Sequence, residues 1–308
     1  ACEVFAAILK REPDNKHAGT GMAAALSRLS RHEQAASLFA KLVERHPNDA
    51  NLCGNAAQAA VARGDAKRAL AFCEKGLAVV PDNQACLALS SLAYRLLGDE
   101  RDELLSGYDR FIRVFDLEPP QGFSDMAAFN AALDAYLDRL HPHRKEHVAQ
   151  SLRGGSQTVE QVFGAGHDLI GRLQRRIDET VARYIAELEQ DSTHPFLSRK
   201  TKRFSYSGSW SSRLHDHGFH ADHFHPEGWI SSCYYVAVPD VVKDRDSKQG
   251  WIKFGEPDFD TKLPAPVRRA IEPAAGRLIL FPSYLWHGTI PFHAATSRTT
   301  IAFDAVPT

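Results

Sequence analysis

Residues 218–238 read GFHADHFHPEGWISSCYYVAV, and residues 281–288 read FPSYLWHG. In the first segment, His223 and His225 stand two positions apart, directly before a tight turn and a β-prone run, so their side chains share one face of a strand. In the second segment, His287 ends an apolar run that predicts a buried strand. Imidazoles from a hairpin and from a distant strand can together form a metal site that keeps coordination positions open.

The same cluster offers other pairs of ligands. His220 and Asp222 are also two positions apart and would supply a carboxylate, which offsets one charge of a divalent ion. His225 and Glu227 would supply one too, but a proline turn lies between them. The residues themselves leave open whether the pair is His223/His225 or His220/Asp222.

Arg298 stands eleven positions after His287, at the start of another β-prone run. A guanidinium can bind a carboxylate through two hydrogen bonds at once. Metal ligands beside a carboxylate clamp are what a non-haem iron oxygenase with an organic-acid co-substrate needs. We therefore expect Arg298 to hold such a co-substrate.

Residues 201–308 are rich in short β-prone runs that Gly, Pro and Asp turns separate. The runs are RFSYSGSWSSRL, GWISSCYYVAVP, GWIKFGEP, GRLILFP and RTTIAFDAVP. Short strands at this spacing predict a sandwich or jelly roll. Because the helical patterns come first and do not alternate with the strands, we expect an α+β chain and exclude a doubly wound sheet.

The N-terminal segment contains an internal repeat. Pro13, Pro47 and Pro81 are separated by 34 residues each time and lie in EPDN, HPND and VPDN. A 34-residue period of two helices is typical of tetratricopeptide repeats. We assign residues 1–118 to such repeats and expect their concave groove to hold a peptide or a partner protein. The alternative is a helical spacer, or a surface that joins copies of the chain into a homo-oligomer.

Residues 119–200 are expected to link the two parts and to buttress the β-rich core. Residues 125–140 have helical periodicity, with Ser124 as the predicted N-cap. Residues 167–190 carry the apolar stripe of a long amphipathic helix. A stripe of this kind predicts packing against the sheet rather than a functional surface.

Residues 141–158 are polar and contain Gly154-Gly155, which predicts a long loop. On this loop, Arg153 could reach an anionic group or remain in solvent. The sequence does not distinguish these two roles.

The chain has the composition of an ordinary globular protein, with 308 residues, 44% apolar and 24% charged, and a net charge of −1. This charge gives no general attraction to nucleic acid or to an anionic membrane, and no apolar run approaches the roughly 18 residues of a membrane-spanning helix. The five cysteines are scattered, which favours free thiols and a cytoplasmic location. Because Ala1 falls inside an expected helix, we expect the native N-terminus to lie upstream.

Several blocks of residues 108–307 carry a family resemblance. They are QSLRGGSQT, SGSWSSRL, GFHADHFHPEGWISSCYYVAVPD, GWIKFGEPD, GRLILFPSYLWHGTIPF and SRTTIAFDAVP. With them the chain resembles the 2-oxoglutarate/Fe(II) oxygenases that carry an N-terminal tetratricopeptide segment. The resemblance implies a double-stranded β-helix, a cupin-like jelly roll, and it implies Fe(II), 2-oxoglutarate and O₂ as cofactor and co-substrates.

The resemblance also implies roles for individual residues. The HxHP segment of the family favours His223, His225 and His287 as the iron ligands, although the commonest triad of the superfamily has an acid in the second position. Arg298 is implied as the clamp on 2-oxoglutarate. Tyr235 is implied as a hydrogen-bond donor to the same carboxylate, and Arg213 is a further candidate for this pocket.

The implied activity is hydroxylation of a peptide or protein side chain, with decarboxylation of 2-oxoglutarate to succinate. One alternative is a small-molecule hydroxylase whose repeats serve assembly. Another is a non-catalytic adaptor that binds metal weakly. The presence of all three imidazoles and of Arg298 argues against the adaptor.

Overall fold

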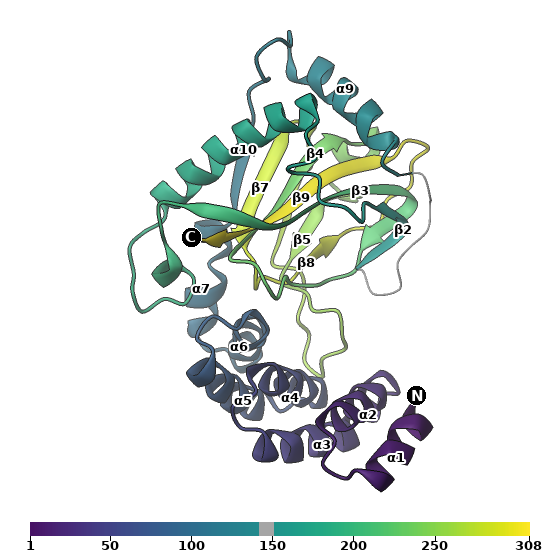
Figure 1. Ribbon diagram of the computed structural model, residues 1–308, viewed down its shortest axis with the longest axis vertical. Coiled ribbons are helices and arrows are strands. Elements are labelled where there is room, and N and C mark those ends of the chain that lie inside the picture. Colours follow the sequence, from purple (N-terminus) through teal and green to yellow (C-terminus); the bar gives the residue numbers. More distant parts are fainter. Residues whose placement is uncertain (142–150) are drawn as a thin grey trace. The chain divides into compact units, whose positions relative to one another are not determined.

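The computed structural model describes residues 1–141 and 151–308, which form two compact units (Figure 1). The first unit comprises Ala1–Ser106 with Phe259–Ala265, and the second comprises Gly107–Asp258 with Pro266–Thr308.

The division lies earlier in the chain than the end of the repeats predicted at residue 118. Residues 107–118 belong to the second unit. The physical reason is β1 (Arg113–Asp116), which pairs antiparallel with β7 (Arg277–Pro282) and so extends the sheet of the second unit.

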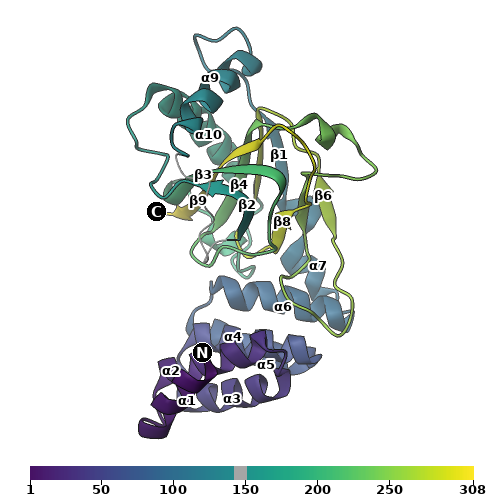
Figure 2. The ribbon, with the colours of Figure 1, turned by 90° about the vertical axis from the view of Figure 1, so that its right-hand side faces the viewer.

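The first unit is a row of antiparallel helices joined by short turns (Figure 2). They are α1 (Cys2–Arg11), α2 (Lys16–Arg28), α3 (His32–Arg45), α4 (Ala50–Arg63), α5 (Ala66–Val79), α6 (Gln84–Leu97) and α7 (Arg101–Ser106).

Capping residues explain why the boundaries of these helices recur at a regular spacing along the chain. Asn15, Asp49 and Asn83 are the N-caps of α2, α4 and α6, and each side chain accepts a hydrogen bond from a backbone N–H of the first turn. Gly64 and Gly98 end α4 and α6 in the left-handed conformation, which a residue without Cβ adopts readily. The repeat in the sequence is therefore a repeat of helix boundaries.

The second unit is built on two antiparallel sheets. The larger has the order β1-β7-β4-β9-β3-β2 and the smaller the order β6-β5-β8. The remaining strands are β2 (Leu152–Gln157), β3 (Phe204–His220), β4 (Ile230–Ala237), β5 (Ile252–Phe254), β6 (Arg269–Ile271), β8 (His287–Thr289) and β9 (Arg298–Pro307). Together the sheets form the predicted jelly roll, so the expected α+β fold class is confirmed.

Helices cover the larger sheet. The helices of this unit are α8 (Tyr108–Phe111), α9 (Met126–Asp138), α10 (Asp168–Glu187) and two 3₁₀ turns, Leu197–Arg199 and Asp240–Lys243. The hydroxyl of Tyr234 on β4 bonds to Asn130 on α9 at 2.7 Å. Figure 1 shows α10 running along the sheet beside β7.

Two local predictions for this region need correction. The N-cap of α9 is Asp125, whose side chain accepts from the Ala128 N–H, whereas Ser124 contacts the Asp125 carboxylate instead. The segment predicted as a long loop contains strand β2, and residues 142–150 of that segment lie outside the described residues. None of the helices in the described part of the chain has the length and apolar character needed to cross a bilayer.

Strand β2 lies unusually close to β3. Gly154 has a φ of +65°, and the pairing of the two strands shifts between Arg153 and Gly155. A Cβ on Gly155 would lie 2.3 Å from the carbonyl oxygen of Arg213 and 3.0 Å from the Cα of Leu214. Both atoms belong to the backbone of β3, so only glycine fits without moving a strand.

We predict that Gly155→Ala destabilises the protein, since overpacking of this kind costs about 1–3 kcal/mol. Gly171→Ala in α10 is the matched control, because the nearest atom to its Cβ is the end of the Arg175 side chain at 3.7 Å. The control should be neutral or stabilising by roughly 0.5–1 kcal/mol. Urea unfolding measures both variants, and equal stability of Gly155→Ala and wild type would contradict the close approach of β2 to β3.

Candidate metal centre and co-substrate cavity

Backbone hydrogen bonds bring the three predicted histidines together. His223 lies just beyond β3 and forms an isolated antiparallel bridge with His287 at the start of β8. Each of the two backbone N–H groups donates to the other residue's carbonyl at 2.9 Å. The N–H of His225 donates to the carbonyl of Ser283, also at 2.9 Å. These bonds place three imidazoles from two separate segments around one point.

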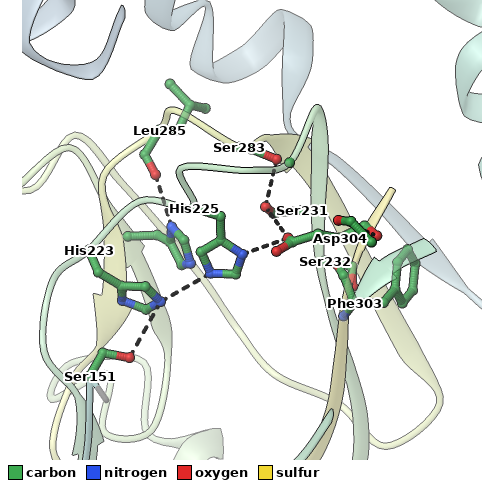
Figure 3. Close-up of polar contacts among 12 residues, drawn as sticks. Ser151, His223, His225, Ser231, Ser232, Ser283, Leu285, Phe303 and Asp304 are labelled. Carbon is green, nitrogen blue, oxygen red and sulfur yellow. Dashed lines mark hydrogen bonds and ion pairs between the residues drawn. The ribbon is translucent and has the colours of Figure 1, made fainter. Parts of the chain in front are cut away.

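The ring nitrogens of this cluster converge. One nitrogen from each of His223, His225 and His287 lies within 4.8 Å of the others. The Nε2 atoms of His223 and His225 face each other at 3.2 Å (Figure 3). Ligands about 2.1 Å from one ion and nearly at right angles to each other have this separation.

Each ring is oriented by a contact at its Nδ1. In His223 this atom lies 2.8 Å from the carbonyl oxygen of Ala221, and in His287 it lies 2.9 Å from that of Leu285. In His225 it lies 2.5 Å from Oδ1 of Asp304. Because these oxygens accept hydrogen bonds, Nδ1 carries the proton and the lone pair is on Nε2.

When both rings are neutral with the proton on Nδ1, the two facing Nε2 atoms of His223 and His225 are both acceptors. A cation between them would turn this repulsion into attraction. The donor set of the cluster, which is neutral imidazole nitrogen, suits iron and other divalent transition metals. The geometry and the donor atoms of the cluster therefore suit a metal ion.

Burial keeps the imidazoles of His223 and His287 neutral. It lowers the pKa of His223 to about 3, with a further contribution from the neighbouring His225. It also lowers the pKa of His287 well below its ordinary value, and the other imidazoles act in the same direction. Neutral imidazole is the form that binds a metal, so at neutral pH His223 and His287 are ready to bind one.

The three histidines line a cavity of about 410 Å³ that also contains the predicted clamp. Arg298 lines it and is only 1% exposed. Its Nε has no hydrogen-bond partner among the described residues, although the Cys233 thiol lies nearby. A buried guanidinium with an unused donor, facing a cavity, suits a carboxylate ligand.

Tyr235 contacts this arginine. The guanidinium carbon of Arg298 is 4.9 Å from the centre of the Tyr235 ring, which is a cation–π contact. Tyr235 is not among the residues that line the cavity. In the structure its ring therefore supports the arginine.

The prediction that Arg213 faces the same pocket is wrong. Arg213 pairs with Asp134 at 2.7 Å and with Asp138 at 3.4 Å, both on α9. Its neighbour Ser212 lines the cavity. Successive residues of a strand point to opposite faces, so Arg213 points away.

The alternative pairs of ligands are not gathered in this cluster. His220 lines the cavity, but Asp222 pairs with Lys253 at 2.7 Å and does not line it. Glu227 lines the cavity without belonging to the group of converging nitrogens. Among the competing pairs, the geometry favours His223 and His225. Arg153, left undecided by the sequence, donates to the backbone carbonyl of Leu152 at 2.8 Å.

Asp304 was not anticipated from the sequence. It stands on β9, is 9% exposed, and contacts His225 and the hydroxyl of Ser231, the latter at 2.6 Å. The Ser231 hydroxyl also lies 2.8 Å from that of Ser283 (Figure 3). The sequence feature that could have indicated Asp304 is its position as a single acid within the otherwise apolar run IAFDAVP.

Comparison with known families agrees with this geometry. Residues 208–304 match a family model described as "Putative 2OG-Fe(II) oxygenase", and residues 28–93 match the tetratricopeptide repeat model. The first segment is a 2OG-Fe(II) oxygenase domain. The cofactor and co-substrates of this oxygenase domain are Fe(II), 2-oxoglutarate and O₂, as predicted. The protein is accordingly a dioxygenase with a repeat segment before it.

Solved structures similar to the chain include two hydroxylases. A prolyl-4-hydroxylase from Pseudomonas putida is 14% identical, with a TM-score of 0.43 over 72% of this chain and 99% of that chain. A viral collagen prolyl hydroxylase from Paramecium Bursaria Chlorella virus-1, solved with 2OG, is 12% identical, with a TM-score of 0.39 over 64% of this chain and 97% of that chain. MamA from AMB-1 is 19% identical, with a TM-score of 0.31 over 33% of this chain and 60% of that chain. No curated protein matches the chain.

The lowered pKa values predict a pH dependence of the metal-free oxygenase. Unfolded imidazoles have a pKa of about 6.5. The folded state disfavours protonation of His223 and His287. Between about pH 6.5 and pH 3, the unfolded state therefore binds more protons than the folded state. The free energy of unfolding should therefore be highest above pH 6.5 and decrease over this window.

Chemical denaturation at several pH values measures this effect. Asp222 acts in the opposite direction, because burial raises its pKa to about 6. The difference between wild type and His223→Gln isolates the histidine contribution. Parallel pH profiles for the two proteins would show that His223 does not resist protonation.

Proposed function

We propose that this dioxygenase hydroxylates a side chain of a peptide or protein, using His223, His225 and His287 to hold Fe(II) and Arg298 to hold 2-oxoglutarate. One observation carries the proposal. The three imidazoles converge at the wall of the same cavity into which the buried Arg298 faces.

The protein side chains have distinct tasks in this proposal. The three imidazoles bind the metal through Nε2 and leave other coordination positions open. Bound Fe(II) supplies the redox chemistry that divides O₂ between succinate and the hydroxylated product, with release of CO₂ from 2-oxoglutarate. Arg298 binds the carboxylate of 2-oxoglutarate that does not reach the metal, and Tyr235 holds Arg298 in place.

The size of the cavity supports a side chain as the substrate. Its volume of about 410 Å³ is near the lower end of the usual range for small-molecule sites. Once 2-oxoglutarate is bound, the remaining space suits one side chain better than a bulky free molecule. Glu227 and Phe224 line this cavity as well and are candidates for contact with the substrate.

The repeat segment supports a macromolecular substrate. Tetratricopeptide helices stack into a concave surface, which commonly binds a peptide or a partner protein. We infer that the repeat groove recruits the substrate or the protein that contains it. A cytoplasmic location remains a prediction from the sequence, and it agrees with five cysteines that are all free thiols.

We predict that His287→Ala abolishes iron retention and, with it, peptide-dependent formation of succinate. The physical reason is the loss of one of the three ligands that converge among the described residues. Iron content after anaerobic reconstitution and succinate release with a peptide library are the two measurements. His17→Ala, at an exposed position on α2, is the control and should behave as wild type. Full iron content in His287→Ala would remove this residue from the site.

We predict that Arg298→Ala raises the 2-oxoglutarate concentration needed for half-maximal succinate release by roughly 30–150-fold. This change corresponds to the loss of about 2–3 kcal/mol from a charged, two-bond contact. Arg213→Ala is the matched control, because Arg213 pairs with Asp134 away from the cavity. An unchanged 2-oxoglutarate requirement in Arg298→Ala, or an equal rise in both variants, would place the clamp elsewhere.

A further inference from the structure

The three imidazoles of the candidate metal centre have unequal partners. His223 and His287 are each oriented by a neutral backbone carbonyl, whereas His225 is oriented by the carboxylate of Asp304. His225 is also the residue that occupies the place of the acid in the commonest triad of the superfamily. The imidazole that replaces an acidic ligand is thus the one whose ring contacts an acid.

Asp304 is held firmly at this position. Its Oδ1 accepts from Ser231 at 2.6 Å and lies 2.5 Å from Nδ1 of His225. The residue stands opposite Ser231 in the pairing of β4 with β9. Both strands are interior to the larger sheet, so the carboxylate cannot easily turn away.

The Asp304 carboxylate has an imidazole as its ion-pair partner. The ion-pair partner of its carboxylate in the described part of the chain is His225, and no Lys or Arg of that part pairs with it. A buried carboxylate whose charge no Lys, Arg or metal ion balances is unfavourable for folding. A divalent ion on the far side of the same ring would compensate this cost.

We propose that Asp304 is a positioning residue that supplies, through the His225 ring, the negative charge that an acidic ligand would otherwise supply to the metal. This inference rests on the proposed function, since it takes the three histidines as the ligands. The carboxylate fixes the proton of His225 on Nδ1, keeps Nε2 directed at the metal and makes the ring a stronger donor. Asp304 itself does not touch the metal.

The test uses Asp304→Asn in the full chain. Asparagine has nearly the same shape, and its Oδ1 can still accept from His225 and Ser231, so the substitution removes mainly the charge. The probe is Co²⁺, titrated against a competing chelator and followed by its visible absorption. We expect the dissociation constant for Co²⁺ to rise about 10–100-fold.

A second readout separates this role from a merely structural one. Without metal, Asp304→Asn should be as stable as wild type or more stable, because a buried charge has been removed. The rise in melting temperature on adding Co²⁺ should be smaller than in wild type. A variant that loses stability without metal but binds Co²⁺ as tightly as wild type would overturn the proposal.

Two further variants complete the experiment. Ser231→Ala keeps the charge and removes one hydrogen bond, so it should weaken Co²⁺ binding less than Asp304→Asn does, and a larger loss would count against the role of charge. If Asp304→Asn does not fold, Asp304→Glu takes its place, with Co²⁺ binding expected to stay closer to wild type than that of His287→Ala. Binding as weak as in His287→Ala would overturn the proposal.

His287→Ala is measured in the same assay to distinguish two kinds of failure. If His287→Ala loses Co²⁺ while Asp304→Asn binds it normally, Asp304 has no role but the ligand set stands. If His287→Ala also binds normally, the ligand set itself is wrong, and the proposed function fails with it.

Discussion

The pair of backbone hydrogen bonds between His223 and His287 is the constraint on which the candidate site depends. These residues are far apart in the sequence and belong to segments that follow β3 and begin β8. The reciprocal bonds of 2.9 Å fix both Cα positions before any metal binds. Ring orientation then needs only one further contact for each imidazole. The site is thus organised by the same hydrogen bonding that joins the sheets.

Charge explains why one cavity combines these groups. Burial makes the imidazoles of His223 and His287 neutral, so these two residues add no negative charge to a bound divalent ion, and Arg298 adds another positive charge to the same cavity. Such a cavity strongly favours a ligand with two negative charges. 2-Oxoglutarate has one carboxylate for the metal and one for the guanidinium, which matches both positive groups.

The sequence predicts those features that depend on spacing along the chain. The 34-residue period returns as the step between the caps Asn15, Asp49 and Asn83. The HxH spacing and the apolar run before His287 predict residues that the structure brings together. In each case the relevant period, whether of a helical repeat or of a strand, is visible in the residues themselves.

Features that depend on pairing between strands could not be read in the same way. The side of β3 on which Arg213 lies depends on bulges, and the register shifts between Tyr206 and Gly208. Asp304 gains its importance from standing opposite Ser231, a neighbour that its own strand does not specify. The four residues of β1 likewise belong to the sheet through their pairing with another strand, which their own sequence does not predict.

This last strand has a consequence for any attempt to separate the two parts of the chain. β1 is the terminal strand of the larger sheet and follows the repeats by only a few residues. Cutting after residue 118 would leave the backbone groups of β7 unpaired along one side, and an open edge of this kind invites aggregation. An oxygenase unit prepared alone must therefore begin at or before Gly107, where the compact unit itself begins.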